Sequence, residues 1–123
     1  MTTTLLDADG NPPTVRRGTS PTMTFAIKNA DGTAKNLTGA TEASFAVARA
    51  ANATTRLLLI ELGNGVSHDG DAGNVSVTFT DLQTEALPPG PLWCELWITD
   101  FTGLRDLPGA GSFIVYDSLV TVP

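Results

Sequence analysis

A chain of 123 residues is one domain by the usual size range, and it is long enough to bury a core without disulfides or a structural metal. Its formal charge of −6 and its seven scattered Lys and Arg residues argue against nucleic acid or an anionic membrane as the main partner, since both need clustered positive charge. No apolar run approaches the roughly 20 residues that span a bilayer, so no membrane segment is predicted.

The chain opens with a segment, residues 1–13, that is predicted to be an arm. It begins Thr-rich, carries the pair Leu5 and Leu6, and continues into a glycine and two prolines that break regular structure. Such an arm is either disordered or laid on a neighbouring protein. Because the start of the chain has neither the basic nor the apolar stretch of a signal peptide, we expect synthesis and folding in a cytoplasm.

From residue 14 onward, short segments in which apolar and polar residues alternate are typical of half-buried strands. The predicted strands are 14–15, 22–28, 42–49, 57–62, 75–79, 92–99 and 112–116. The stretch 65–73 is predicted to be a loop, and Asp81 is expected to cap a helical turn over 82–86 that ends at two prolines. The tail, residues 118–123, could add an edge strand or dock outside the domain.

This succession of seven or eight short strands, with almost no helical periodicity, predicts an all-β fold. We expect an antiparallel immunoglobulin-like β-sandwich over residues 14–117, with a small β-barrel as the alternative. The Cys…Trp…Cys pattern of antibody domains is absent, because Cys94 is the only cysteine. It lies within an apolar run and is predicted to be a small buried core residue.

The penultimate predicted strand carries both tryptophans. Side chains alternate along a strand, so Trp93, Glu95 and Trp97 share one face. The opposite face is aliphatic and is expected in the core: Leu92, Cys94, Leu96 and Ile98. The tryptophans then face either another part of the chain or a partner protein, because Trp is enriched where proteins bind one another. Together with Leu5 and Leu6, they are the candidate partner-binding residues.

No combination of residues predicts an enzyme. Ser67, His68 and Asp69 are consecutive, yet consecutive residues on an extended loop point in different directions, whereas a nucleophile needs its base within hydrogen-bond reach. The stretch 69–74 begins like a calcium loop but lacks the glycine and the bidentate acid at the EF-hand positions. We therefore expect no catalytic residues, no metal and no cofactor. A hydrolase that uses the His68 loop is kept as a hypothesis beside the two given below.

Six short motifs follow one another along the chain: Arg17-Gly-Thr19, Lys28 to Gly39 with its Asp-Gly turn and Asn-Leu-Thr-Gly end, Gly73-Asn-Val75, Leu87-Pro-Pro-Gly90, Asp100-Phe-Thr-Gly103 and Gly111-Ser-Phe-Ile114. In this order they resemble the N-terminal domain of the phage baseplate upper protein family and related small immunoglobulin-like domains of tailed-phage virions. Two features depart from that family. Gly90-Pro-Leu-Trp93 stands where the family has Gly-x-Tyr, and the long receptor-binding or stalk region is missing.

The resemblance implies a non-enzymatic virion structural protein of a tailed phage. It would be an adaptor or decoration subunit that docks tail, baseplate, fibre or capsid proteins, with several symmetric copies in the virion. The residues themselves suggest an alternative, a carbohydrate-binding β-sandwich module that uses Trp93 and Trp97 as a stacking platform. Neither nucleic acid nor a membrane is expected as a partner.

Overall fold

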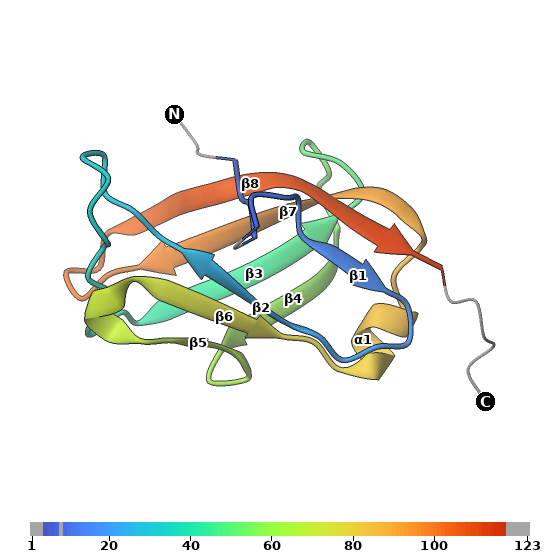
Figure 1. Cartoon of the computed structure of the whole chain (residues 1–123), viewed down its shortest axis with the longest axis horizontal. Helices are drawn as coiled ribbons and strands as arrows, with labels where there is room; N and C mark the ends of the chain where they lie inside the picture. The colour runs from blue at the N-terminus through green and yellow to red at the C-terminus, as the bar shows by residue number, and fades with distance from the viewer. Residues whose placement is uncertain (1–3, 8, 118–123) are drawn as a thin grey trace.

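The computed structural model describes residues 4–7 and 9–117, in which eight strands form one hydrogen-bonded sheet with the order β1-β8-β7-β3-β4-β5-β6-β2 (Figure 1). The strands are β1 Thr14–Arg16, β2 Thr22–Ala26, β3 Glu42–Ala48, β4 Arg56–Leu62, β5 Gly65–His68, β6 Asn74–Thr78, β7 Gly90–Thr99 and β8 Arg105–Tyr116. The predicted all-β class is confirmed.

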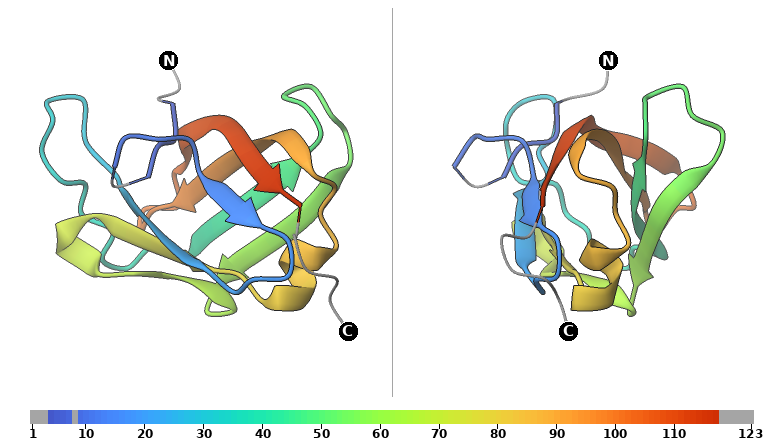
Figure 2. Two further views of the ribbon diagram at one scale, coloured as in Figure 1. Left: turned by 45° about the vertical axis from the view of Figure 1, so that its right-hand side comes forward. Right: turned by 90° about the vertical axis from the view of Figure 1, so that its right-hand side faces the viewer.

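The sheet curls so that its two ends come round to enclose a core. Seen along its length, β1 and β2 lie on one side of the molecule and β3 and β4 on the other (Figure 2). Most neighbouring strands are antiparallel, while β1 pairs in parallel with β8 and β4 in parallel with β5. The packing is that of a sandwich, and the continuous hydrogen bonding is that of a partly open barrel.

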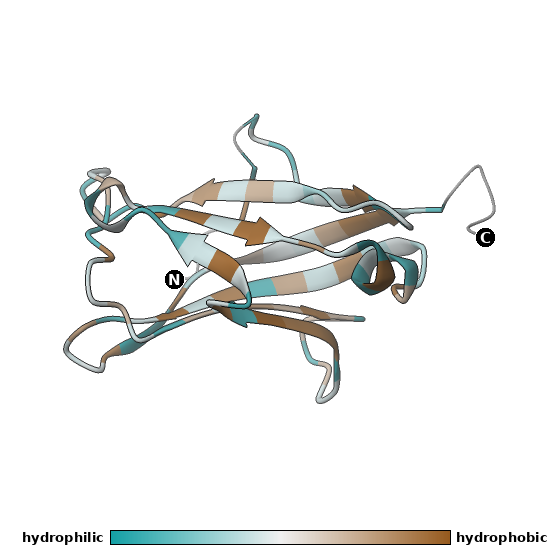
Figure 3. Ribbon diagram, turned by 90° about the horizontal axis from the view of Figure 1, so that it is seen from below, coloured by the Kyte–Doolittle hydropathy of each residue, from teal (hydrophilic) through white to brown (hydrophobic). Residues whose placement is uncertain are grey.

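The core is built from the inward faces of these strands, and apolar bands alternate with polar bands along each ribbon (Figure 3). At its centre, four phenylalanine rings from distant parts of the sequence pack together: Phe25, Phe45, Phe79 and Phe113. Their ring centroids lie 5.8 to 5.9 Å apart, in stacked, tilted and edge-to-face arrangements. Such aromatic pairs add to the stabilisation from apolar burial. The cluster therefore joins strands from both sides of the curled sheet.

The one α-helix of the described residues, α1 (Asp81–Glu85), begins one residue earlier than predicted. Its cap is Thr80 rather than Asp81, because the Thr80 hydroxyl accepts the Gln83 amide at 3.1 Å and the Gln83 side chain accepts the Thr80 amide at 2.8 Å. This reciprocal pair is a capping box. No helix in the part of the chain that the structure describes is long and apolar enough to cross a membrane.

The stretch 65–73 is more regular than the loop predicted from its glycines. It contains β5, which pairs with both β4 and β6, followed by a 3₁₀ turn over Gly70–Ala72. The short strand escaped prediction because only Val66 is apolar in it, so there is no alternation to detect.

Strand β8 begins seven residues before the predicted start at residue 112. Its first half contains Leu107 and Pro108, which lie opposite Trp97 where the β7–β8 register shifts by one residue. A bulge of this kind tolerates proline, because the missing amide has no ladder partner to lose. A Pro-Gly pair is usually typical of a turn, and for this reason the strand appeared shorter from sequence.

The N-terminal arm is partly built into the chain's own sheet. The Leu5 amide donates to the Ala110 carbonyl at 2.9 Å, and the Leu5 side chain is only 4% exposed. Gly109 makes room for it, since a Cβ there would lie 2.7 Å from Leu5 Cδ1. The predicted tail, residues 118–123, lies outside the described residues.

Candidate functional site

The outer face of β7, β3 and β4 is hollowed into a groove of about 290 Å³. Trp93 and Trp97 on β7 form one wall, and Leu59 and Glu61 on β4 form the other. Between them runs β3, whose outward side chains along the floor of the groove are small: Ser44, Ala46 and Ala48 follow Glu42, which lies at the Arg105 end. The groove therefore arises because one strand with short side chains lies between two strands with long ones.

A single carboxylate holds both tryptophans in place. Trp93 Nε1 donates to Glu95 Oε2 at 3.0 Å, and Trp97 Nε1 donates to Glu95 Oε1 at 2.9 Å. Trp93, Glu95 and Trp97 occupy every second position of β7 and so share its outer face, as predicted. Indole donors usually find a partner when they are partly buried, and a charged acceptor makes the stronger hydrogen bond. The aromatic wall is thus held in place by the chain itself.

One end of the groove is closed by Arg105, whose guanidinium lies 4.5 Å from the centroid of the Trp97 ring. Arg105 Nε also donates to Glu42 Oε1 at 3.0 Å, and the Thr99 hydroxyl donates to the same oxygen at 2.6 Å. These two hydrogen bonds lower the pKa of Glu42, and the one from Thr99 contributes more than the one from Arg105. Arg105 therefore covers one face of Trp97.

Trp93 borders open space on two sides. The groove lies on one side, and a shallower hollow lies on the other, lined by Trp93 together with side chains of β8 and Thr4 of the arm. Small residues of β8 next to it keep this second hollow open: Ala110, Gly111 and Ser112. The indole is therefore anchored at its edge by Glu95 while its flanks face two recesses.

The four predicted partner-binding residues do not come together. Trp93 and Trp97 share the groove, whereas Leu5 belongs to the core and Leu6, 40% exposed, lies beside a different hollow. Cys94 is buried as expected, and burial raises the pKa of its thiol to about 12. Partner binding by the four residues stays a prediction.

Next to the Arg105 end of the groove, the β7–β8 turn exposes two apolar side chains that were not among the predicted site residues. Phe101 is 73% and Leu104 is 66% exposed. The turn is ordered by Asp100, whose Oδ1 accepts the amides of Thr102 and Leu104 at 2.9 and 3.0 Å. The Thr102 hydroxyl also donates to Asp100 and is the main reason why the pKa of Asp100 is lowered. In the sequence, the position of Phe101 inside an otherwise polar turn could have indicated these exposed side chains.

The residues considered for catalysis or metal binding have structural roles. His68 Nδ1 accepts the Gly70 amide at 3.1 Å, and the two carboxylate oxygens of Asp69 accept the Asn74 amide and side chain, each at 2.9 Å. Across residues 4–7 and 9–117, no group of three or more His, Cys, Asp or Glu side chains could hold a metal ion. That the protein is not an enzyme stays a prediction.

No known protein family matches this sequence, and a comparison with curated proteins likewise finds no match. Solved structures with a similar fold include CopC from Methylosinus trichosporium OB3b, at 11% identity and a TM-score of 0.48, covering 97% of this chain and 98% of that one. They also include the PmoD soluble domain from Methylocystis sp. ATCC 49242 (Rockwell), at 13% identity and a TM-score of 0.45, covering 83% and 76%. The likeness concerns the fold alone.

These findings contradict the resemblance to the phage baseplate upper protein family. The similar structures are not phage proteins, and no family matches, so the predicted role as a tailed-phage virion subunit and the predicted location in the virion are wrong. The structure shows why the motifs misled. Asp31 and Asp100 accept amides within their own turns, and Gly32 and Gly103 both have φ of +88°. Such residues are demanded by turn geometry in any β-protein.

Proposed function

We propose that this chain is a non-enzymatic protein-binding module that docks a partner protein on the outer face of β7, β3 and β4, with Trp93 as the anchor. The observation that carries the proposal is the setting of Trp93, which is fixed at its edge by Glu95 and flanked by two recesses. A partner can enclose such a side chain on both flanks. Since Glu95 already orders the ring, little conformational entropy is lost on binding.

The exposed turn favours a protein over a small ligand. Phe101 and Leu104 lie in the turn that leads directly into Arg105, at one end of the groove. Exposed apolar side chains beside an aromatic groove are typical of surfaces that a second protein covers. Trp and Arg are also the residues enriched in the centres of such interfaces.

The sequence-based alternative of a two-tryptophan stacking platform fits this geometry less well. Flat stacking on both rings requires both to present an open face, and Arg105 covers one face of Trp97. A saccharide could therefore stack flat on Trp93 only, so the platform would consist of one ring instead of two.

The test is the loss of binding when Trp93 is truncated. Proteins retained by the immobilised chain are identified by mass spectrometry and purified, and each is titrated by calorimetry against the unaltered chain and against a Trp93→Ala variant. An interface anchor contributes about 2 kcal/mol or more, so we expect Trp93→Ala to weaken binding by roughly 30-fold. Leu82→Ala serves as the control, because Leu82 is 78% exposed on α1, outside the groove.

Two results would overturn the proposal. One is a purified partner that binds the Trp93→Ala variant as tightly as the unaltered chain. The other is a glycan array on which the unaltered chain binds a saccharide through Trp93 while no protein partner is found.

A further inference from the structure

Strand β2 lies at one end of the sheet and pairs only with β6. In an antiparallel pair, alternate residues bond to the neighbouring strand, while those between them direct their amides and carbonyls outward. The Ile27 amide donates to the Gly73 carbonyl at 2.8 Å, and the Phe79 amide donates to the Pro21 carbonyl at 2.9 Å. The odd-numbered residues of this strand are therefore the bonded ones.

It follows that Thr22, Thr24 and Ala26 turn their backbone groups away from β6, toward the free edge. The N-terminal arm runs near this edge but pairs with β8 and not with β2, since Thr4 pairs with Ala110 of β8. Within the described part of the chain, no backbone hydrogen bond reaches the free edge of β2. Edges of this kind recruit extended segments unless something covers them.

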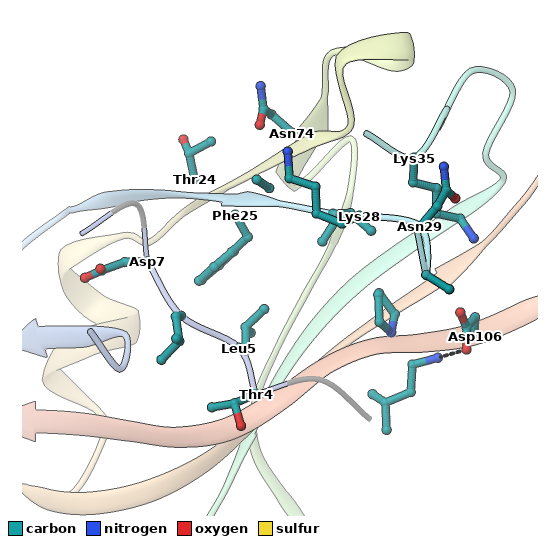
Figure 4. A pocket seen from close by; sticks show the side chains of 16 residues that line it. Thr4, Leu5, Asp7, Thr24, Phe25, Lys28, Asn29, Lys35, Asn74 and Asp106 are labelled. Atoms are coloured by element: carbon teal, nitrogen blue, oxygen red, sulfur yellow. Dashed lines mark hydrogen bonds between the residues drawn. The ribbon is translucent and has the colours of Figure 1, made fainter. Parts of the chain in front are cut away.

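Beside the free edge lies a hollow of about 740 Å³ (Figure 4). Phe25 points into it from β2, and Leu5 lies opposite on the arm. Its charged residues come in equal numbers of each sign: Asp7, Lys28, Lys35 and Asp106. The hollow thus offers backbone hydrogen bonds along one wall, apolar side chains at its base and no net charge.

The shape decides what can enter. The hollow is bounded by β2 on one side and by the arm and β8 on the other, so the edge of a second folded sheet is too thick for it. A single extended strand fits, because it needs only one neighbour for pairing and a place for alternate side chains.

We propose that this edge receives residues 118–123 of a second copy of the chain, which pair with β2 as an added strand. The segment Ser-Leu-Val-Thr-Val-Pro is uncharged, like the strand it would meet, and is rich in β-branched residues. Val120 and Val122 share one face of it and would lie over Phe25 and Leu5.

A second copy is favoured over the same copy by the direction of β8. The segment follows the end of this strand at Tyr116, whereas the hollow includes Asp106 near its start. Ten residues of strand separate Asp106 from Tyr116, a distance of about 33 Å. The described residues therefore end at the far end of β8 from their own hollow, and we place the following segment in the hollow of a neighbour.

The experiment measures the oligomeric state of the full chain by light scattering over a range of concentrations, together with amide exchange of β2. We expect concentration-dependent association and slow exchange at Thr22, Thr24 and Ala26 in the associated form. Val120→Asp should abolish both, while Thr121→Asp, whose side chain faces outward, should retain them.

A backbone variant tests the other side of the contact. Thr24→Pro removes an outward amide that the β2–β6 ladder does not use, so the fold should persist and association should be lost. Thr24→Ala is its control, because it deletes the hydroxyl paired with Ser76 at 3.0 Å but keeps the amide.

Three outcomes would overturn the inference. The first is a full chain that stays monomeric with fast exchange along β2. The second is a monomer with slow exchange at these amides, which would mean that the segment docks on its own copy. The third is association that Val120→Asp and Thr24→Pro both leave intact.

Discussion

The two faces of β7 show two different ways of ordering side chains in the same ten residues. On the inner face, Leu96 and its neighbours are held by apolar packing and are almost fully buried. On the outer face, Trp93 and Trp97 are only half-buried and are held by hydrogen bonds to Glu95. Packing stabilises the fold whether or not a partner is present, whereas the hydrogen-bonded face stays accessible to one. The comparison suggests that stability and recognition are divided between the faces.

The sharpest way to break this division is to compare one substitution on each face. Leu96→Ala removes a fully buried side chain and should lower the free energy of unfolding by about 2–5 kcal/mol, from lost burial and the cavity that remains. Leu59→Ala makes the same chemical change on the half-buried groove wall and should cost markedly less. Urea denaturation of both variants measures the difference. Equal losses would show that the outer face carries as much of the stability as the core.

A smaller effect is expected when the shared acceptor of the outer face is removed. Glu95→Ala leaves both indole donors without their partner and should cost about 1 kcal/mol, since the site is partly open to water. The near-ultraviolet circular dichroism of the tryptophans should weaken as the rings gain freedom. Glu61→Ala, which alters an exposed carboxylate of the same groove, is the control. An unchanged tryptophan signal in Glu95→Ala would show that packing alone positions the rings.

The smallest effect concerns the turn beyond the groove. Hydrogen bonds, chiefly from the Thr102 hydroxyl, lower the pKa of Asp100 from the ordinary value of 3.8. A lowered pKa means that the turn gains order above the unfolded pKa and loses it as the pH falls through the folded pKa. The amide resonances of Thr102 and Leu104 should therefore be constant from pH 7 to about pH 5 and should shift only in stronger acid. In Asp100→Asn the acid transition should vanish, and its persistence would assign it to another carboxyl group.

Most of the fold could be predicted because strand alternation is a local property. The inner and outer faces of β7 followed from the order of residues alone. Segments whose character depends on distant contacts were missed. The first half of β8 contains Pro108 and Gly109, which indicate a turn until the bulge opposite Trp97 and the packing of Leu5 are known.

The candidate site was predictable only in part, for the same reason. The two tryptophans could be placed on one face. The position of Arg105 over the Trp97 ring, however, depends on the β7–β8 register, which sequence alone does not give. The small residues of β3 also gained meaning only when β3 proved to lie between β7 and β4. The phage resemblance failed because its motifs report turn geometry, which unrelated β-proteins share.

The parallel pairing of β1 with β8 determines how the domain would respond to tension. Force drawing β1 toward its start and β8 toward its end would slide the two strands along each other in opposite directions. All of their backbone pairs would then bear load together, along with the contacts of Arg16 and Arg17 to Asp117. Strands joined in this way resist a pull in shear, the direction in which a ladder of hydrogen bonds cannot open one rung at a time.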